Sequence, residues 1–437
     1  MNHRKVIKQV IPKKTFKAVE PYGHWAEAAL AQVKFLFPAR KLKVIGVTGT
    51  DGKTTTCYLI YEMLKNSGKK TAMITTASVD YGDGKGQQPN PTTLTTGNVF
   101  KLLDIIKTIA NNDVEYLVLE VSSHALNQRR VWGIPFYLAV HTNMSHEHLD
   151  YHGTFENYKK AKGILFELCN KNKNGLQTGV INADDKTASF FKDKIKNPVL
   201  YGTKNGDIKA TSVKSSLEGN QFTVISGKDE YSVNLRLIGE FNVYNALAAV
   251  CVGHAVGLDK QQIKEGIASL DYVTGRMMPV DEGQNFHVFI DYAVTPAALD
   301  SVLATANNLK MKSAKVHIVF GATGDRDKEK RPIMGEVTSQ QADYVYLTDD
   351  ETYTEDPTTI IDAVYTGVDD KNKDKVKIIN DRKMAIKAAL KSAKKDDVVI
   401  ISGIGHQASR NMGGKKVAWS DIEVTKELLK NKNHLSK

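Results

Sequence analysis

The chain has 437 residues, of which 41% are hydrophobic and 25% charged, and its formal net charge is +11. This is ordinary globular composition, which excludes a disordered chain, and no apolar run approaches the length of a membrane span. The excess of Lys and Arg would suit an anionic partner, but no helix-turn-helix, zinc finger or aromatic RNA-reading motif accompanies it. We therefore favour small anionic substrates over nucleic acid.

The cysteines point to a reducing compartment. Cys57, Cys169 and Cys251 are far apart and odd in number, so they form neither a disulfide framework nor a zinc knuckle. The basic start of the chain has no small-residue cleavage site of a signal peptide. We expect a cytoplasmic protein.

The first half of the chain has the pattern of an α/β domain. Residues 1–41 hold one expected helix, HWAEAALAQVKFLF, and are too short to form a domain alone. From Lys43 onward, β-branched runs (KVIGVTG, TAMITT, YLVLEV) alternate with helices expected from Lys53 and near Val99–Ile109, which predicts a parallel sheet. Short alternating strands over 207–238 are expected to flank this sheet in antiparallel fashion.

A second α/β series follows. Helical patterns at 242–256 and 260–270 lead to Gly275, after which strands and helices alternate again through HVFIDYA, VHIVFGA, YVYLTDD and VVIISG. The sequence thus predicts an N-terminal extension over 1–41, a central domain over 42–274 and a C-terminal domain over 275–437.

The segment KVIGVTGTDGKTTT predicts a phosphate-binding loop. A buried strand, a glycine-rich turn and a helix start follow in the order that lets backbone N–H groups surround a phosphate. Lys53 would reach the β and γ phosphates, and the Thr54 hydroxyl would bind Mg²⁺. Gly46 is one residue too far from Gly52 for the usual spacing, so the loop is a variant. The plainer interpretation is a tight turn that uses glycine only for positive φ.

Candidate metal ligands follow the loop. Glu120 ends a predicted strand, where loop residues of an α/β sheet gather around ligand. The segment HTNMSHEHLDYHGTFENYKKAK is rich in His, Asp and Glu, which suit Mg²⁺ beside a triphosphate. Taken singly, His146, His148 and His152 are more simply surface or structural histidines, and the lysines of this segment a solvated helix face.

At this point the sequence resembles the Mur ligases, most closely those of the MurE type, from about residue 28 to 425. The resemblance is carried by GVTGTDGKTTT, EVSSHAL, HLDYHGTFENYKKAK, GEFNVYNALAA, TGRM, DYAVTP and FGATGDRDKEKRP, which match in order and spacing. It implies an α/β fold, with a P-loop ATPase-type central domain built on a parallel sheet and a Rossmann-like C-terminal domain.

The resemblance also implies the site residues. The catalytic set would be Lys53, Glu120, His148, Lys162 and Arg276, with Lys162 carbamylated by CO₂ so that it becomes an anionic ligand. Metal would be held by Thr54, Glu120, His148 and Lys162. The residues that would bind ATP are Gly49, Thr50, Asp51, Gly52, Lys53, Thr54, Thr55, Asn245, Arg276 and Asp291. Those that would bind the acceptor are Thr95, Thr96, Ser122, Gln128 and Arg130. Those that would bind the amino acid are Arg326, Asp350, Tyr353, Gly403 and Gln407.

The implied reaction is ATP- and Mg²⁺-dependent ligation of an amino acid to UDP-MurNAc-L-Ala-D-Glu or a similar acceptor through an acyl phosphate, in peptidoglycan precursor synthesis. Catalysis would consist chiefly of positioning and of neutralising phosphate charge. MurE-type enzymes carry an N-terminal domain that binds UDP, and here only about forty residues precede the phosphate loop. A partner protein or a rearranged surface would then bind UDP, or the acceptor lacks it. We expect a monomer.

The amino-acid residues depart from the family pattern. Diaminopimelate-adding members have Asp-Asn-Pro-Arg where this chain has Asp350-Glu351-Thr352-Tyr353, and Ile404 and Gln407 stand where lysine and glutamate are usual. Val294 also replaces a usual histidine. Because a site that pairs buried polar groups discriminates strongly, we expect diaminopimelate not to be preferred. L-lysine, through Asp350 or Glu351, or a smaller or neutral amino acid stays open.

Three other interpretations stay open. A ligase of the folylpolyglutamate synthase kind would explain a chain without the UDP domain, although EVSSHALNQRR and DYHGTFENYKKAK resemble the MurE type more closely. A second is a nucleotide-binding scaffold without catalysis. The retention of Glu120, His148, Lys162 and Arg276 speaks against it. A nucleic-acid-binding protein is a distant third on charge alone.

Overall fold

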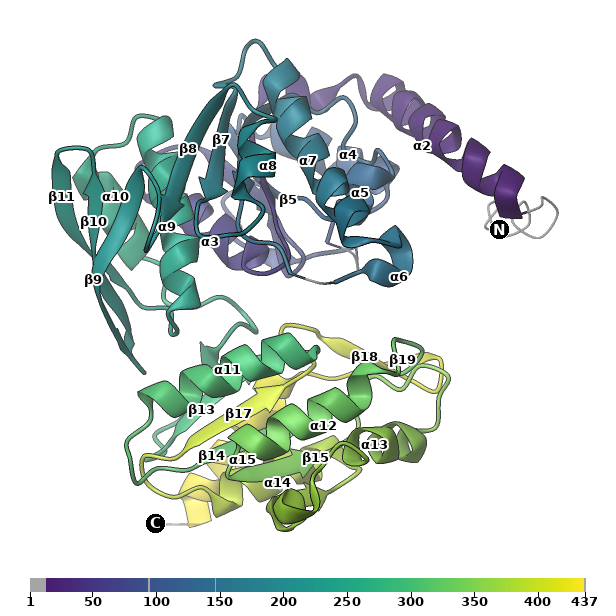
Figure 1. Ribbon diagram of the computed structural model, residues 1–437, viewed down its shortest axis with the longest axis vertical. Coiled ribbons are helices and arrows are strands. Elements are labelled where there is room, and N and C mark those ends of the chain that lie inside the picture. Colours follow the sequence, from purple (N-terminus) through teal and green to yellow (C-terminus); the bar gives the residue numbers. More distant parts are fainter. Residues whose placement is uncertain (1–12, 93–94, 146, 436–437) are drawn as a thin grey trace. The chain divides into compact units, whose positions relative to one another are not determined.

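The computed structural model describes residues 13–92, 95–145 and 147–435 (Figure 1). Its chain divides into two compact units. Unit 1 comprises residues 1–213, 221–235 and 241–270, and unit 2 comprises 214–220, 236–240 and 271–437. No helix in the described ranges is long and apolar enough to cross a membrane.

Unit 1 is built on an eleven-stranded sheet in the order β11-β10-β9-β8-β7-β6-β1-β5-β2-β3-β4. The neighbours from β2 through β5, β1, β6, β7 and β8 to β9 are parallel, and β3 and β4 add antiparallel pairs at one edge. The strands are β1 (Lys43–Thr48), β2 (Thr71–Ile74), β3 (Ser78–Asp80), β4 (Gln88–Pro89), β5 (Tyr116–Glu120), β6 (Phe136–His141), β7 (Thr178–Asn182), β8 (Asn197–Gly202), β9 (Ile208–Ser216), β10 (Gly219–Ser226) and β11 (Asp229–Leu235).

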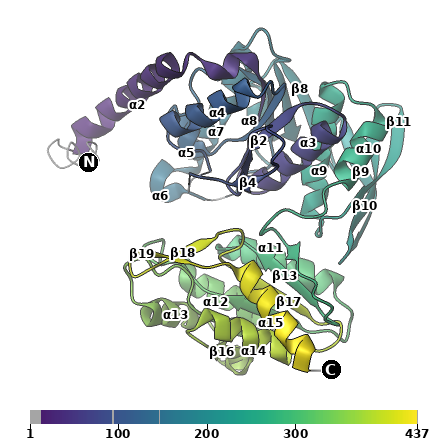
Figure 2. The same ribbon diagram turned by 180° about the vertical axis from the view of Figure 1, so that it is seen from behind.

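The helices of unit 1 belong to two sets. Helices α4 and α7 share one hydrophobic core with Val44 of β1, whereas α3 packs against α9 and α10 (Figures 1 and 2). The helical elements are α2 (Lys13–Phe35), η1 (Pro38–Lys41), α3 (Lys53–Asn66), α4 (Val99–Asn111), α5 (Ser123–Asn127), α6 (Leu149–His152), α7 (Phe155–Lys171), α8 (Ala188–Lys192), α9 (Phe241–Ala255) and α10 (Lys260–Ala268).

Unit 2 has a six-stranded sheet in the order β12-β13-β17-β14-β15-β16, parallel except for β12. Its strands are β12 (Met278–Pro279), β13 (His287–Asp291), β14 (Val316–Phe320), β15 (Tyr344–Leu347), β16 (Val376–Ile378) and β17 (Val398–Ser402), and β18 (Ser409–Met412) pairs with β19 (Lys415–Ala418) apart from them. Its helices are α11 (Pro296–Leu309), α12 (Lys330–Gln341), α13 (Pro357–Tyr365), η2 (Asp370–Lys375), α14 (Arg382–Ser392) and α15 (Asp421–Leu435).

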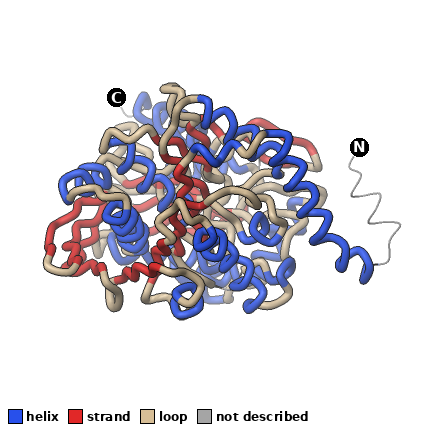
Figure 3. Tube along the Cα trace, turned by 90° about the horizontal axis from the view of Figure 1, so that it is seen from above, coloured by secondary structure: helices blue, strands red, loops and turns tan. Residues whose placement is uncertain are grey.

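Helices cover both faces of the unit 2 sheet because its strands are apolar on both sides. In β17, Val398 and Ile400 join the core of α11, α12 and α13, whereas Val399 and Ile401 join that of α14 and α15. Strands and helices of the described residues can be followed by colour in Figure 3. The predicted α/β fold class, with a parallel central sheet and a Rossmann-like second sheet, is confirmed.

The sequence patterns located most elements correctly. The expected helices at 242–256 and 260–270 are α9 and α10, and HVFIDYA, VHIVFGA, YVYLTDD and VVIISG contain β13, β14, β15 and β17. The strands expected over 207–238 are β9, β10 and β11, joined by two-residue loops as in antiparallel hairpins. β9 itself runs parallel to β8, which continues the central sheet.

Glycines at the two ends of α3 have almost the same backbone but different surroundings. Gly52 precedes the helix with φ +78°, and Gly68 follows it with φ +82°. A Cβ on Gly52 would overlap Oδ1 of Asn245, whereas one on Gly68 would meet nothing within 4 Å. Asn245 therefore requires glycine at position 52.

This pair allows a matched stability test. We expect Gly68→Ala to lower the free energy of unfolding by about 1–2 kcal/mol, the cost of a left-handed L-residue. Gly52→Ala should cost about 1–3 kcal/mol more, because the added methyl displaces Asn245. Urea unfolding of both variants measures the difference. Equal losses would contradict the contact with Asn245.

Candidate active site

The loop between β1 and α3, residues 49–52, has the backbone of an anion-binding turn. Its Gly49 and Gly52 have φ +153° and +78°, and Gly52 caps α3, so the unpaired N–H groups of the first helical turn lie at the loop. The Lys53 Nζ donates to the Thr50 carbonyl at 2.6 Å. Among the described residues, a neutral carbonyl is the one hydrogen-bond partner with which a phosphate would compete for this amino group.

Contacts from β6 and α7 hold the loop in shape. Thr142 Oγ1 donates to the Asp51 carbonyl at 2.6 Å, and the Asp51 N–H donates to Asn143 Oδ1 at 3.0 Å. The hydroxyls of Thr50 and Tyr158 lie 3.2 Å apart. The loop is therefore ordered by its neighbours, and binding need not organise it.

Glu120 lies at the carboxyl end of β5, opposite Val47 of the adjacent parallel strand β1. Its side chain is 1% exposed. It accepts hydrogen bonds from Thr54 Oγ1 at 3.0 Å, from the Thr76 N–H at 2.9 Å and from Thr76 Oγ1 at 2.9 Å. Parallel strands thus bring a carboxylate to the phosphate loop, and Thr76, which sequence reasoning missed, fixes its orientation.

Lys162 reaches the same loop from α7. It is 1% exposed, its Nζ donates to the Gly49 carbonyl, and it lies 4.5 Å from the centre of the Tyr158 ring. Burial, reinforced by the positive charge of Lys53, holds the pKa of Lys162 well below its usual value. The amine is therefore neutral far more readily than an exposed lysine.

The predicted histidine ligand, His148, also lies near Tyr158. The ring centres of His148 and Tyr158 are 6.0 Å apart, and His148 Nε2 lies 3.7 Å from Glu147. His152 is buried with its Nε2 3.0 Å from Ser123 Oγ, so its plainer interpretation as a structural histidine fits. His146 lies outside the described residues.

The predicted metal ligands do not form an all-protein metal cage. Within the described ranges, no group of three or more His, Cys, Asp or Glu side chains is placed to hold a metal ion. Thr54 and Glu120 meet directly, and Lys162 and His148 approach the same loop through Gly49 and Tyr158. A metal here would need further oxygen ligands, as Mg²⁺ beside a triphosphate does.

The residues expected to bind an acceptor form one polar cluster beside Glu120. Thr95 Oγ1 lies 2.9 Å from Thr76 Oγ1, to which it can donate, and Thr96 Oγ1 donates to the Glu120 carbonyl at 3.1 Å. Ser122 caps α5. The guanidinium of Arg130 donates to the Thr96 carbonyl at 2.6 Å and, twice, to Gln128 Oε1 at 3.0 and 2.6 Å.

Asn245 and Thr55 complete the loop's surroundings in unit 1. Asn245 is buried in α9 and accepts a hydrogen bond from Thr56 Oγ1 at 3.3 Å. Thr55 is buried in the first turn of α3. The remaining residues predicted to bind ATP, Arg276 and Asp291, belong to unit 2.

Arg276 precedes β12, and Asp291 ends the neighbouring strand β13 of the second sheet. Asp291 Oδ2 accepts from the Met277 N–H at 2.7 Å. Burial raises the pKa of Asp291 against the opposing effect of Arg276. The Arg276 guanidinium lies 4.9 Å from the centre of the Tyr292 ring, and burial with this cation nearby lowers the pKa of His406 to about 4.

The predicted amino-acid residues meet in unit 2. The Arg326 guanidinium lies 5.3 Å from the centre of the Tyr353 ring. Asp350 is 2% exposed, lies against Gly403, and its Oδ2 has no hydrogen-bond partner among the described residues. Gln407 Nε2 donates to Tyr292 Oη at 3.3 Å. This end of the unit 2 sheet therefore carries both charge signs, and Asp350 Oδ2 lies 3.9 Å from Nη1 of Arg382.

Sequence reasoning missed the ion pairs that support this cluster. Arg382 is fully buried and donates to Asp421 through Nε at 2.8 Å and Nη2 at 2.7 Å, and Arg410 pairs with Asp349 at 2.6 Å. No local pattern pairs either arginine with its distant carboxylate, so sequence reasoning had no signal for these contacts. The bidentate contact of Arg382 with Asp421 and the single hydrogen bond of Arg410 to Asp349 hold the loops that carry Asp350 and Gly403.

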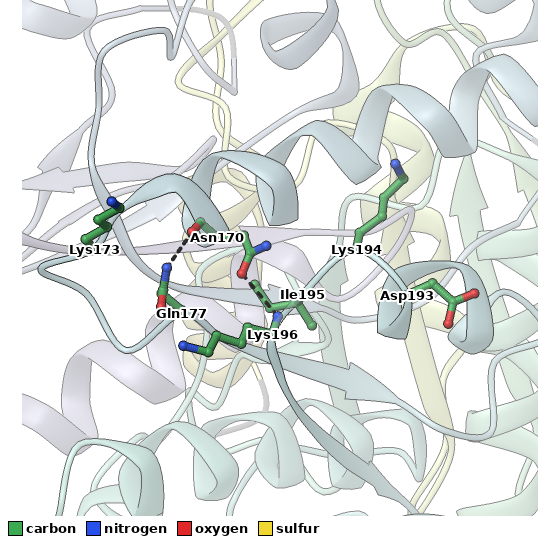
Figure 4. A pocket seen from close by; sticks show the side chains of 7 residues that line it. All are labelled: Asn170, Lys173, Gln177, Asp193, Lys194, Ile195 and Lys196. Carbon is green, nitrogen blue, oxygen red and sulfur yellow. Dashed lines mark hydrogen bonds between the residues drawn. The ribbon is translucent and has the colours of Figure 1, made fainter.

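A basic pocket of about 560 Å³ lies away from the phosphate loop (Figure 4). Its polar atoms bond to each other: Gln177 Nε2 donates to the Asn170 carbonyl at 2.6 Å, and the Lys196 N–H donates to Asn170 Oδ1 at 3.1 Å. Its lysines are those of an ordinary solvated surface.

Comparison with known proteins agrees with this arrangement. A model of the Mur ligase middle domain matches residues 47–253, and one of the Mur ligase glutamate ligase domain matches residues 275–405. The UDP-N-acetylmuramoyl-L-alanyl-D-glutamate–2,6-diaminopimelate ligase of Caldanaerobacter subterraneus is 38% identical over 92% of this chain and 82% of its own length. That of Bacillus cereus is 38% identical over 96% and 83%.

Solved structures give the same family. A diaminopimelate ligase of this kind superposes with a TM-score of 0.64 at 32% identity, covering 90% of this chain and 79% of its own. Folylpolyglutamate synthase of Mycobacterium tuberculosis reaches 0.69 at 17% identity over 86% and 91%, which shows a shared fold alone. The matched domains and the relatives together show that this chain belongs to the Mur ligase family of ATP-dependent ligases.

Proposed function

We propose that this chain joins an amino acid to the carboxylate of UDP-MurNAc-L-Ala-D-Glu, with ATP converted to ADP and phosphate. The acceptor is the one named for the relatives that are 38% identical to it. The observation that carries the proposal is the convergence of Glu120, Thr54 and a buried, readily neutralised Lys162 on one phosphate loop.

In the proposed reaction, an acceptor carboxylate oxygen attacks the γ-phosphorus and ADP leaves, giving an acyl phosphate. The amine nitrogen then attacks the acyl carbon, phosphate leaves with the carboxylate oxygen, and the nitrogen loses a proton as the amide forms. Lys53 and the helix N-terminus stabilise the transferring phosphoryl group, and Arg276 adds charge to it. Thr95, Thr96, Ser122, Gln128 and Arg130 hold the acceptor, and Asn245 and Asp291 the nucleoside.

The residues fit Mg²⁺. Thr54 Oγ1 and Glu120 Oε2 are hard oxygen donors 3.0 Å apart, and Mg²⁺ keeps several ligands from water and substrate phosphate. A neutral Lys162 amine can add CO₂ and lose a proton to become a carbamate, whose oxygens would be metal ligands. His148 would be a further ligand. Bound metal would neutralise charge on the transferring phosphoryl group.

The domain roles follow from these residues. We propose that 42–274 binds ATP and acceptor, that 275–437 binds the amino acid, and that 1–41 is an extension. The buried, free Cys57, Cys169 and Cys251 support a reducing, cytoplasmic setting. We propose a monomer to which a partner protein can contribute UDP binding.

The carbamate gives the first test. We expect Lys162→Ala to lower ATP-, acceptor- and amino-acid-dependent ADP release at least about 100-fold, because one anionic ligand is lost. Propionate, which can place a carboxylate in the vacated space, should restore part of the activity, and ADP should still bind. The neighbouring Lys160→Ala, on the exposed side of α7, is the matched control. Full activity of Lys162→Ala would contradict the assignment.

We further propose that diaminopimelate is not the preferred amino acid. Tyr353 stands where an arginine would meet the distal carboxylate, and Glu351 lies beside it, its Oε1 accepting from the Asn411 N–H at 3.0 Å. A distal carboxylate would therefore face Glu351 without a cation assigned to it. Arg326 would remain to pair the α-carboxylate.

An amino-acid panel in the ADP-release assay tests this preference. The kcat/KM for meso-diaminopimelate should be at least about 10-fold below that of the best substrate, because two distal contacts are lost. The double variant Tyr353→Arg with Gln407→Glu should raise it relative to that substrate, and Tyr353→Phe should not. If diaminopimelate were the fastest substrate of the unmodified chain, the proposed preference would be wrong.

A further inference from the structure

A cavity of about 910 Å³ in unit 1 has no role in the chemistry derived above. It lies between α2, the segment that joins α5 to β6, and the second half of α7. Its volume is within the range of about 300–1,000 Å³ that small-molecule and cofactor sites occupy. All of its walls belong to unit 1.

Its lining combines the Trp132 indole with several cations. The Trp132 indole packs edge-on against Trp25 with ring centres 6.0 Å apart, and the Trp132 carbonyl accepts from Gln32 Nε2 at 2.7 Å. Arg129, Lys171 and Lys173 supply positive charge. This is the combination of stacking platform and phosphate-pairing groups that nucleotides require.

The acids of the lining already have partners, and these cations do not. Glu167 pairs with Lys194, and Glu20 lies 3.8 Å from His24. Within the described ranges no ion pair joins Arg129, Lys171 or Lys173 to a carboxylate. The cavity thus has positive charge left for an anion.

Arg129 occupies a backbone position that favours glycine. It follows the C-cap Gln128 of α5, has φ +54°, and its N–H donates to the Leu126 carbonyl at 3.1 Å. A non-glycine residue there costs about 1–2 kcal/mol. The guanidinium is therefore held at the cavity at the expense of stability.

Hydrogen bonds connect the cavity to the phosphate loop. Tyr151 and Asn127 line the cavity, and Tyr151 Oη accepts from Gln128 Nε2 at 3.0 Å and from Asn127 Nδ2 at 3.1 Å. Gln128 bonds to Arg130, and Arg130 bonds to Thr96, which bonds to the Glu120 carbonyl. The acceptor cluster therefore lies between the reacting end and the cavity.

We propose that this cavity binds the nucleoside diphosphate half of the acceptor. The pyrimidine base stacks on Trp132, and the diphosphate pairs with Arg129 and with Lys171 or Lys173. This assignment rests on the proposed function for the acceptor's identity, since a carboxylate at the phosphate loop and a nucleotide at the cavity are the two ends of one molecule.

The test uses UDP alone and the whole chain. UDP should bind in calorimetry and compete with the acceptor in the ADP-release assay. Arg129→Gly, which relieves the strained backbone, should leave unfolding stability equal or higher while weakening UDP and raising the acceptor KM at least 10-fold, with the KM for ATP unchanged. Trp132→Leu should weaken UDP similarly.

Two controls separate the causes. Asp113→Gly relieves the same φ, +54°, away from the cavity, and Lys101→Ala removes an exposed cation of α4. Neither should change UDP binding. If the chain catalyses ligation but UDP does not bind, or Arg129→Gly leaves UDP binding unchanged, the cavity is not the UDP site. The proposed function then still stands. If the chain catalyses no ligation but binds UDP, and Arg129→Gly abolishes that binding, the cavity is supported as the UDP site and the proposed function is rejected.

Discussion

The burial of the Lys162 amine against the Gly49 carbonyl is the constraint on which the rest of the site depends. An ammonium group removed from water costs several kcal/mol unless it is paired, and Lys162 meets a carbonyl, an aromatic ring and the charge of Lys53. The cheapest solution is a neutral amine. A structure chosen for stability alone would place a hydrophobic residue here, so the position indicates chemistry.

The loop and the helices around it are arranged to keep that amine in place. Tyr158 lies beneath Lys162 and contacts Thr50 with its hydroxyl, while Glu120 is held by Thr54 and Thr76 from two other segments. These groups follow the ends of parallel strands or lie in the helices after them. The sheet therefore sets the distances between the groups. The same geometry extends through Thr96 and Arg130 toward the cavity at Trp132.

The sequence predicted most strands and helices, because these depend on local pattern. The strand and glycine turn before Lys53 and the carboxylate at the end of β5 follow from periodicity and from parallel-sheet geometry. Partners distant in sequence could not be predicted this way. Thr50 and Tyr158 are 108 residues apart, and Arg382 and Asp421 are 39 apart, and no local pattern pairs them. The cavity could not be predicted from local pattern either, since its walls come from segments far apart in the sequence.

In the proposed reaction the acceptor carboxylate is phosphorylated before the amine attacks. The most direct measurement starts from acceptor in which both oxygens of the reacting carboxylate are a heavy isotope and follows the phosphate released in one turnover by mass spectrometry. Each phosphate should then contain one heavy oxygen atom, and ADP should be the nucleotide product. Phosphate without the heavy isotope, or AMP in place of ADP, would show that no acyl phosphate forms in this way.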